Sequence, residues 1–360
     1  RTLETPRGIV EVSLANPGLV RRDGRRAAHT PLERAALQGA LLRASEALFE
    51  PLMMDPDEPA LDLDEFSDLV NATTGLSPEV IRHQLELLSE TLRDLSARVA
   101  RCEPTRIESL GVILPSNAIA VNRAWLPALV CGARVALKPG ASDPFTPHRV
   151  VSALVSGGIP ADNFSIYPST HETTGALIGM WPRVQLFGDA EVVARYGEDA
   201  RVQVNGPGKS AVVLGPDCDL GGYVDALAEG IVMHEGRSCL NTSSIVTLGG
   251  PERAAWLADA LAKRLARVPG VRLADHAKAQ AVARFVSERL LEPGARRASV
   301  PAICVQGPGG ELRLGPTVVH CERHDHPLAR VELPFAFVSV TALQASELIE
   351  WLGTTLSVAT

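Results

Sequence analysis

From residue 109 to about residue 205 the sequence alternates short β-branched runs with short helical stretches, and few folds accommodate this pattern. The runs predict strands at residues 110–114, 134–137, 164–167, 184–187 and 202–204. Helices are expected between them, at residues 121–130, 147–156, 173–179 and 190–196. Elements in this order indicate right-handed crossovers and an α/β fold with a parallel, nucleotide-binding sheet.

The alternation continues after the sharp turn at Gly206-Pro207-Gly208, and we place a domain boundary there, between residues 1–208 and residues 209–360. In the second unit we expect strands at residues 210–214, 244–248, 301–305 and 335–340. Helices are expected in this unit at residues 220–234, 251–265, 276–291 and 343–352. The second unit is therefore also predicted to be α/β.

Two helices are predicted ahead of the first sheet, at residues 32–50 and 78–101, because apolar residues recur there at helical spacing. Ser77 is a suitable N-cap for the second helix, and Pro78 suits its first position. Both helices are expected to cover the sheet. The basic run at residues 21–26 is interpreted as a solvated loop rather than a phosphate-binding patch.

The composition excludes several classes of protein. The 360 residues are 46% hydrophobic and 21% charged, which is typical of a globular chain and not of a coiled coil or a disordered tail. A net charge of -7 with only 4% aromatic residues argues against a nucleic-acid-binding protein. No membrane span is expected, because the longest apolar stretches, such as residues 333–343, are short and contain polar residues.

The six cysteines are scattered, and none forms a Cys-x-x-Cys pair. This spacing indicates neither a disulfide framework nor a zinc ribbon, and it predicts a reducing, cytoplasmic environment with at most one working thiol. No signal peptide is recognised at the start of the sequence, although the sequence begins with Arg1 rather than Met.

Cys239 is the candidate working thiol, because it lies in a glycine-containing loop, Gly236-Arg237-Ser238-Cys239, ahead of an expected strand. Backbone N–H groups in such a loop are expected to lower the thiol pKa and to stabilise an oxyanion. The alternative is a small core residue. His234 could be the base for this thiol, or it could cap the preceding helix.

Two further candidates follow strands of the first unit, at the edge where parallel sheets bind ligands. Asn117 stands after the strand at residues 110–114, and Lys138 ends the next strand. The lysine would place a cation where a nucleotide ribose or phosphate lies. The alternative is an ordinary surface lysine.

The segments from residue 111 onward, taken together, resemble the aldehyde dehydrogenase superfamily. Six motifs match in the family's order: Pro115-Ser116-Asn117 is similar to Pro-Trp-Asn, Lys138-Pro139 to Lys-Pro-Ser-Glu, Leu186-Phe187-Gly188-Asp189 to Phe-Thr-Gly-Ser, Asn205-Gly206-Pro207-Gly208-Lys209 to Glu-Leu-Gly-Gly-Lys, Gly236-Arg237-Ser238-Cys239 to Gly-Gln-x-Cys, and Glu332-Leu333-Pro334-Phe335 to Glu-x-Phe-Gly-Pro. The resemblance implies a Rossmann-like domain, a catalytic domain and a homo-oligomer.

The resemblance also implies roles for these residues. Cys239 would be the nucleophile, with the Asn117 amide and the Cys239 N–H stabilising the oxyanion. Glu332 would hold the nicotinamide ribose. Four residues would lie near the rest of the cofactor, namely Lys138, Pro139, Gly188 and Asp189, and Asn205 and Gly206 would lie beside the acyl-enzyme.

Two departures from the family pattern refine these expectations. Asn205 replaces the glutamate that helps water to hydrolyse the acyl-enzyme, and an amide cannot accept that proton. Superfamily branches without this carboxylate are acylating, and they exchange the acyl group with coenzyme A. Ala141 stands where a glutamate holds the adenosine ribose, which permits NADPH, with NADH as the alternative cofactor.

Residues 73–80 and 325–328 further resemble bacterial acyl-CoA reductases of the luminescence type. In the superfamily the segment similar to residues 333–360 is followed by further elements, so either the chain lacks the family's C-terminal segment or that segment lies beyond the given sequence. The run at residues 320–326 contains histidines and acidic residues that could bind a metal, but a metal site needs four well-arranged ligands, and we expect no metal there.

The sequence therefore predicts NAD(P)H-dependent reduction of an acyl thioester, from acyl-CoA or an acyl carrier, to an aldehyde through a cysteine-bound acyl group. Two alternatives remain. A hydrolytic aldehyde dehydrogenase would oxidise aldehydes without coenzyme A, and a non-catalytic superfamily member would act as a scaffold.

Overall fold

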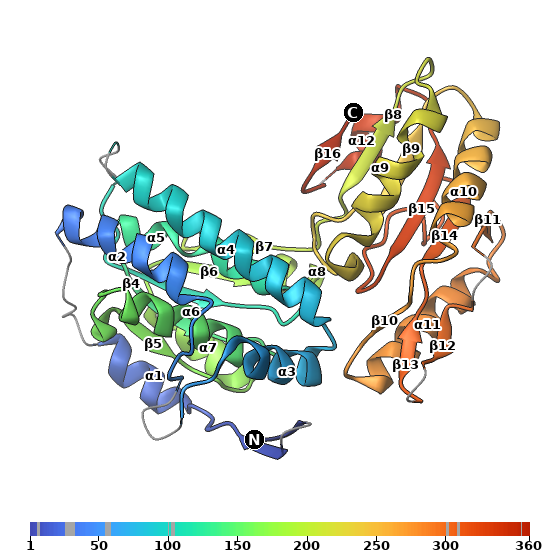
Figure 1. Ribbon diagram of the computed structural model, residues 1–360. Coiled ribbons are helices and arrows are strands. Elements are labelled where there is room, and N and C mark those ends of the chain that lie inside the picture. The colour runs from blue at the N-terminus through green and yellow to red at the C-terminus, as the bar shows by residue number, and fades with distance from the viewer. Residues whose placement is uncertain are drawn as a thin grey trace. The chain divides into compact units, whose positions relative to one another are not determined.

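A computed structural model describes residues 1–5, 8–25, 33–54, 59–99, 101, 105–299, 302–307, 310–353 and 355–360 of the chain. The chain divides into two units, Arg1–Gly206 and Pro207–Thr360. Both are α/β, as the sequence predicts (Figure 1). Among the described helices, none is both long enough and apolar enough to cross a membrane.

The first unit is built on a parallel five-stranded sheet in the order β5-β4-β3-β6-β7. Its strands are β3 (Ser109–Ile113), β4 (Arg134–Lys138), β5 (Phe164–Ile166), β6 (Val184–Phe187) and β7 (Val202–Asn205). The chain adds β4 and β5 on one side of β3 and then crosses to add β6 and β7 on the other side. In parallel sheets with such a reversal, ligands bind at the carboxyl ends of the strands.

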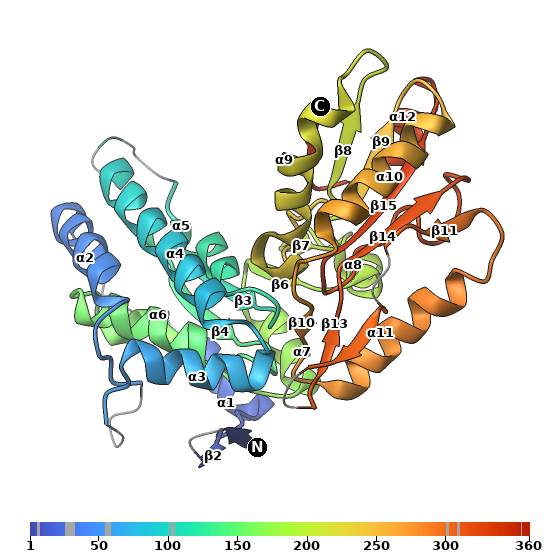
Figure 2. The ribbon, with the colours of Figure 1, turned by 45° about the vertical axis from the view of Figure 1, so that its right-hand side comes forward.

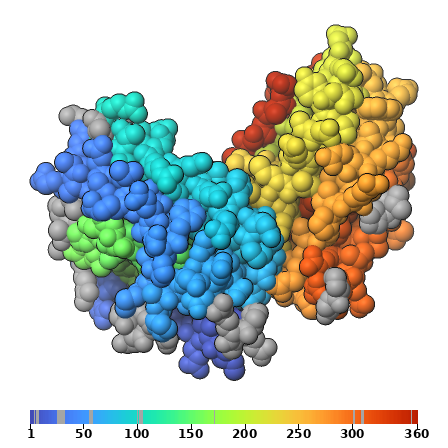
Figure 3. Space-filling model, in the orientation of Figure 1, coloured from blue at the N-terminus to red at the C-terminus, as the bar shows by residue number. Residues whose placement is uncertain are grey.

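Helices cover both faces of this sheet. The chain segments between the strands contain 3-10 helices at Ile119–Ala124 and Ala161–Asn163 and the helices α5 (Pro127–Val130), α6 (Phe145–Ser156), α7 (His171–Met180) and α8 (Ala190–Tyr196). Ahead of them the chain forms β1 (Thr2–Thr5), β2 (Gly8–Glu11), α1 (Pro17–Gly24), α2 (Arg34–Ala47), α3 (Leu63–Thr74) and α4 (Pro78–Val99). Figure 3 shows residues of α2, α3 and α4, in blue to cyan, on the visible face of this unit.

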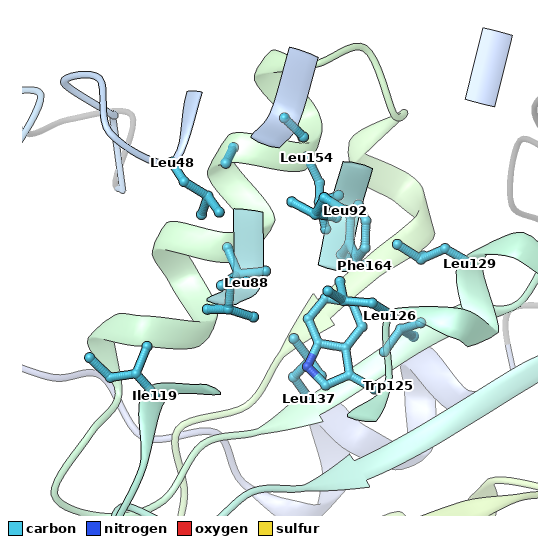
Figure 4. Packing of buried hydrophobic residues seen from close by; sticks show 14 of the residues in the cluster. Leu48, Leu88, Leu92, Ile119, Trp125, Leu126, Leu129, Leu137, Leu154 and Phe164 are labelled. Atoms are coloured by element: carbon cyan, nitrogen blue, oxygen red, sulfur yellow. The ribbon is translucent and has the colours of Figure 1, made fainter. Parts of the chain in front are cut away.

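The larger core of the first unit lies between α4 and the sheet. Trp125 and Phe164 pack edge to face there, with ring centroids 6.4 Å apart. Figure 4 shows both rings facing Leu88 and Leu92 of α4, and Leu137 of the sheet lies beneath them. The Trp125 indole N–H donates to the Asn122 side chain at 3.1 Å, so the buried ring has no unmatched polar group.

Three features of the first unit differ from the sequence predictions. The basic run at residues 21–26 is not a loop, because Arg21 and Arg22 lie in the last turn of α1, and Arg26 lies outside the described residues. Asn16 starts this helix by accepting the Leu19 N–H at 3.0 Å.

The hairpin of β1 and β2 and the helix α3 were not predicted, although Asp62 and Glu65 form a capping box that marks the start of α3. Leu32, the expected start of α2, also lies outside the described residues.

The second unit is built on a six-stranded sheet in the order β11-β14-β15-β9-β8-β16. Its strands are β8 (Ala211–Leu214), β9 (Ser244–Thr247), β11 (Ala295–Arg297), β14 (Thr317–Cys321), β15 (Phe337–Ala342) and β16 (Val358–Ala359), and only β11 is antiparallel to its neighbour. A separate antiparallel sheet is formed by β10 (Val271–Arg272), β12 (Cys304–Gln306) and β13 (Leu312–Leu314).

The helices of the second unit are α9 (Leu220–Val232), α10 (Pro251–Leu265), α11 (His276–Arg289) and α12 (Leu348–Leu352). Figure 2 shows α9 and α10 beside the strands β8, β9 and β15, and their apolar residues share one core with that sheet. The expected helix at residues 343–352 is shorter, and the expected strand at residues 301–305 is shifted, with Pro301 outside the described residues. The strands β10, β11, β13 and β16 and the fully buried β14 were not predicted.

Candidate active site

Cys239 lies in a loop that leaves α9 through three residues in the left-handed backbone region. These are His234, Glu235 and Gly236, with φ angles of 51°, 60° and 71°. A Cβ atom on Gly236 would lie 2.2 Å from the Ala336 nitrogen, so only glycine fits between this turn and the segment before β15. The two other residues each carry a backbone strain of about 1–3 kcal/mol, which the surrounding contacts must offset.

The segment Gly208-Lys209-Ser210 packs directly on the Cys239 loop. A Cβ atom on Gly208 would lie 2.0 Å from the Cys239 carbonyl oxygen. The Ser210 hydroxyl donates to the same oxygen at 2.7 Å. Two of the six motifs, distant in sequence, are therefore in contact within the second unit.

Glu332 brings a third motif to the same place. Its carboxylate accepts the Lys209 backbone N–H at 2.9 Å, and Lys209 adopts a left-handed φ of 45° to present that group. Burial raises the pKa of the Cys239 thiol, and the negative charge of Glu332 raises it further. The thiol's own backbone N–H and the Ser238 hydroxyl act in the opposite direction.

The predicted lowering of the thiol pKa by a backbone N–H group of the loop is present, but the net shift of the Cys239 pKa is upward. The N–H groups of the loop are present, but burial and the carboxylate outweigh them. The sequence alone does not predict the net direction of this pKa shift, because Glu332 is far from Cys239 in the sequence and approaches it only in the folded chain. His234 lies beyond the end of α9, and its role as a base stays a prediction.

Asn117 and Lys138 lie at the carboxyl edge of the first sheet, as predicted. Lys138 ends β4 with only 7% of its surface exposed, and burial lowers the pKa of its ammonium group. It is therefore not a surface lysine. No carboxylate of the described residues forms an ion pair with it.

The loops after β3 and β4 are in contact at this edge. A Cβ atom on Gly140 would lie 2.2 Å from the Ser116 hydroxyl oxygen, and that oxygen accepts the Ser142 backbone N–H at 3.0 Å. The structure thus brings Pro115-Ser116-Asn117 against Pro139-Gly140-Ala141.

Sequence reasoning missed Arg1 at this place. Its guanidinium donates to the Ala141 carbonyl at 2.5 Å. A small pocket of about 20 Å³ beside the loop is lined by Arg1, Pro139, Gly140, Ala141, Pro168 and Ser169, among others. Nothing in the sequence pattern relates the first residue to position 141, so this contact depends on the folded chain.

Gly188, Asp189, Asn205 and Gly206 lie at the neighbouring strand ends. The Gly188 N–H donates to the Asn205 carbonyl at 3.1 Å, which joins the ends of β6 and β7. The Asp189 carboxylate caps α8 by accepting the N–H groups of Glu191 and Val192. The structure thus gives Asp189 a structural task, and its predicted place beside a cofactor stays a prediction.

The residues considered for a metal site lie mostly in and after β14. His320 is buried in that strand, and burial lowers its pKa. His326 accepts the Leu328 N–H at its Nδ1 atom. The described residues contain no group of three or more His, Cys, Asp or Glu side chains placed to hold a metal ion.

Comparison with known proteins connects these residues to one family. The family model described as "Aldehyde dehydrogenase family" matches residues 83–345. Aldehyde dehydrogenase 1A1 of Homo sapiens is 33% identical over 155 residues, which cover 39% of this chain and 31% of that protein. Aminoacetaldehyde dehydrogenase of Pseudomonas aeruginosa is 28% identical over 247 residues, covering 62% of this chain and 48% of that protein. The match thus spans about a third of the length of the first of these relatives.

Solved structures share the fold. The aldehyde dehydrogenase KauB from Pseudomonas aeruginosa superposes with a TM-score of 0.80 at 18% identity, covering 99% of this chain and 79% of that one. A complex of an aldehyde dehydrogenase from Bacillus cereus with NAD+ gives a TM-score of 0.77 at 17% identity, covering 98% and 78%. These likenesses confirm the predicted fold class, a Rossmann-like parallel-sheet unit with a second α/β unit.

Proposed function

Because the chain belongs to the aldehyde dehydrogenase family, we propose that it is an NAD(P)-dependent oxidoreductase that acts on the carbonyl carbon of an aldehyde through Cys239. The observation that carries this proposal is the packing of Cys239, Glu332 and the segment Gly208-Lys209-Ser210 against one another. These contacts bring three motifs that are far apart in the sequence together around one thiol.

In the proposed reaction the Cys239 thiolate forms a bond to the aldehyde carbon, and the carbonyl oxygen becomes an oxyanion. The Cys239 backbone N–H and the Asn117 amide are the proposed donors to that oxygen. When bound, a nicotinamide cofactor supplies the acceptor for the hydride that leaves the same carbon. The acyl group then remains in thioester linkage to Cys239, until water or a thiol accepts it.

The residues of the first unit fit such a cofactor. Lys138 is a buried cation without an ion-pair partner among the described residues, and ribose hydroxyl or phosphate oxygens would satisfy it. Ala141 leaves room for a 2′-phosphate, and the guanidinium of Arg1 lies beside it. We therefore propose Lys138, Pro139, Gly188 and Glu332 as cofactor-binding residues, with NADPH used at least as well as NADH.

The fate of the acyl group separates two candidate activities. The named relatives are aldehyde dehydrogenases, which favours oxidation of an aldehyde to an acid with water as acceptor. Asn205 favours the second candidate, an acylating enzyme that exchanges the acyl group with coenzyme A or a carrier thiol and runs as an acyl-CoA reductase. The amide of Asn205 cannot take a proton from water.

One experiment tests both candidates. The protein is incubated with an aldehyde and NAD+ or NADP+, with and without coenzyme A, and the absorbance of the reduced cofactor is followed. Turnover without coenzyme A supports the hydrolytic activity, and turnover that requires it supports the acylating one. Acyl-CoA with NADPH tests the reverse direction. Cys239→Ser is the inactive control, and turnover by that variant would contradict the proposed nucleophile.

A further inference from the structure

The buried side chain of Asn241 connects the Cys239 loop to the end of α9. Its Nδ2 group donates to the carbonyl oxygens of Gly230, Ile231 and Met233 at 3.0, 3.3 and 2.6 Å. Its Oδ1 atom accepts the Ser238 backbone N–H at 2.9 Å. Only 6% of the Asn241 surface is exposed, so water does not substitute for these partners.

These bonds supply partners to carbonyls at the end of α9, of which that of Gly230 also accepts the Thr242 N–H at 3.1 Å. The last carbonyls of a helix have no partner within the helix, and a glycine turn often provides one. After α9 the chain instead turns through His234 and Glu235, which have left-handed backbone angles. The Asn241 side chain then donates hydrogen bonds to the carbonyls at the end of the helix. The amide therefore stabilises a turn that its backbone angles alone disfavour.

The same residue also fixes Ser238, the residue that precedes the thiol. Ser238 is held by the Asn241 Oδ1 atom, and the Asn241 N–H donates to the Ser238 carbonyl at 3.0 Å. The Cys239 carbonyl between them accepts the Ser210 hydroxyl. The residue before Cys239 is thus tied to α9 through Asn241, and the Cys239 carbonyl to the segment before β8.

We propose that Asn241 is a positioning residue for the Cys239 thiol. The proposal rests on the proposed role of Cys239 as the nucleophile, and it adds a residue whose side chain touches neither substrate nor cofactor. Loss of the amide frees the loop at both ends. The thiol then becomes more accessible to small reagents while losing the orientation that attack on a carbonyl carbon requires.

The test compares Asn241→Ala and Asn241→Asp with Asn163→Ala. The aspartate keeps the shape and the acceptor but loses both N–H donors. Asn163 is the matched control, because it is also 6% exposed and donates to a local carbonyl, that of Pro160 at 3.1 Å, in the other unit. Turnover is measured with saturating cofactor, and iodoacetamide labelling of Cys239 and of Cys304 is followed by peptide mass spectrometry.

Both Asn241 variants are expected to lose at least tenfold in kcat and to label Cys239 at least threefold faster, with labelling of Cys304 unchanged. Asn163→Ala should change neither quantity. Equal acceleration at Cys304 would indicate general loosening and would overturn the proposal, as would wild-type kcat and labelling in both variants. If the wild type does not turn over, the proposed function fails, and the labelling comparison alone decides the role of Asn241.

Discussion

At the scale of single residues, Glu332 contributes to the acidity of the candidate nucleophile. Burial raises the pKa of Cys239, and the Glu332 carboxylate raises it further. Glu332→Gln removes the charge and keeps the size, so the pKa of the thiol should fall but stay above its ordinary value, because burial remains. The pH at half-maximal iodoacetamide labelling of Cys239 should therefore move to lower pH.

The control for this measurement is Glu322→Gln, which removes an exposed carboxylate that does not act on Cys239. Its labelling profile should coincide with that of the wild type. An unchanged profile in Glu332→Gln would show that burial alone raises the pKa.

Ala141 is expected to decide the choice of cofactor. Ala141→Glu places a carboxylate beside the proposed 2′-phosphate and beside the guanidinium of Arg1. Repulsion of order 1 kcal/mol would shift the ratio of the kcat/KM values by about tenfold toward NADH. Ala141→Gln adds the same bulk without charge, so it should leave the ratio close to that of the wild type. A wild type that strongly prefers NADH would contradict this interpretation of Ala141.

At the scale of elements, the turn before Cys239 depends on one glycine. Gly236→Ala forces a left-handed φ of 71° on alanine and directs its Cβ at backbone atoms of Phe335 and Ala336. We expect a loss of about 2–4 kcal/mol in the free energy of unfolding and a fall in kcat of at least a hundredfold. Thermal melting and turnover of the purified variant measure both effects.

Gly175→Ala is the matched control for that variant. Gly175 lies inside α7, and its Cβ would meet no atom within 4 Å. Alanine there should stabilise the protein by about 0.5–1 kcal/mol, because it lowers the entropy of the unfolded chain. If Gly236→Ala behaves in the same way, the turn is not as tightly packed as its geometry indicates.

The elements also show how far the sequence determines the fold. The strands β3 to β9 were predicted within a few residues, because β-branched runs alternating with helices identify buried parallel strands. By contrast, β14 is also buried, but it was not predicted as a strand. Its last two residues, His320 and Cys321, belong to the segment that the sequence presents as a candidate metal site. α3 was missed although its capping box is in the sequence.

The candidate site was predictable to a similar extent. The motifs placed Asn117 and Lys138 at the sheet edge because that position follows from strand order alone. The sign of the pKa shift of Cys239, the contact of Arg1 with Ala141 and the bonds of Asn241 all depend on segments that meet only after folding. Local sequence patterns carry no information about such contacts.

At the scale of the whole molecule, each unit has apolar cores of its own. The first unit contains the cores beneath α4 and α7, and the second contains those beneath α10 and α11 and one beside α12. Unfolding of the chain is therefore expected to proceed in two transitions in a calorimetric scan, one for each unit.

Arg149 provides a means of assigning those transitions. Its side chain is fully buried in the first unit, and its guanidinium lies 4.8 Å from the centre of the Phe66 ring. The guanidinium also donates hydrogen bonds to three backbone carbonyls, those of Leu48, Glu50 and Leu61. Arg149→Met keeps much of the volume but leaves the three carbonyls without this donor. The cost should be about 3–5 kcal/mol, and it should lower only the transition of the first unit.

Two measurements check this assignment. Calorimetry of Arg149→Met should show one transition at a lower temperature and the other unchanged. Labelling of Cys239, which lies in the second unit, should still increase at the wild-type temperature. Arg149→Lys keeps the charge but not the three-way donor geometry, so its shift should fall between those of the wild type and the methionine variant. A single transition that moves as a whole would show that the two units unfold together, and Arg149 would then stabilise the entire chain rather than one unit.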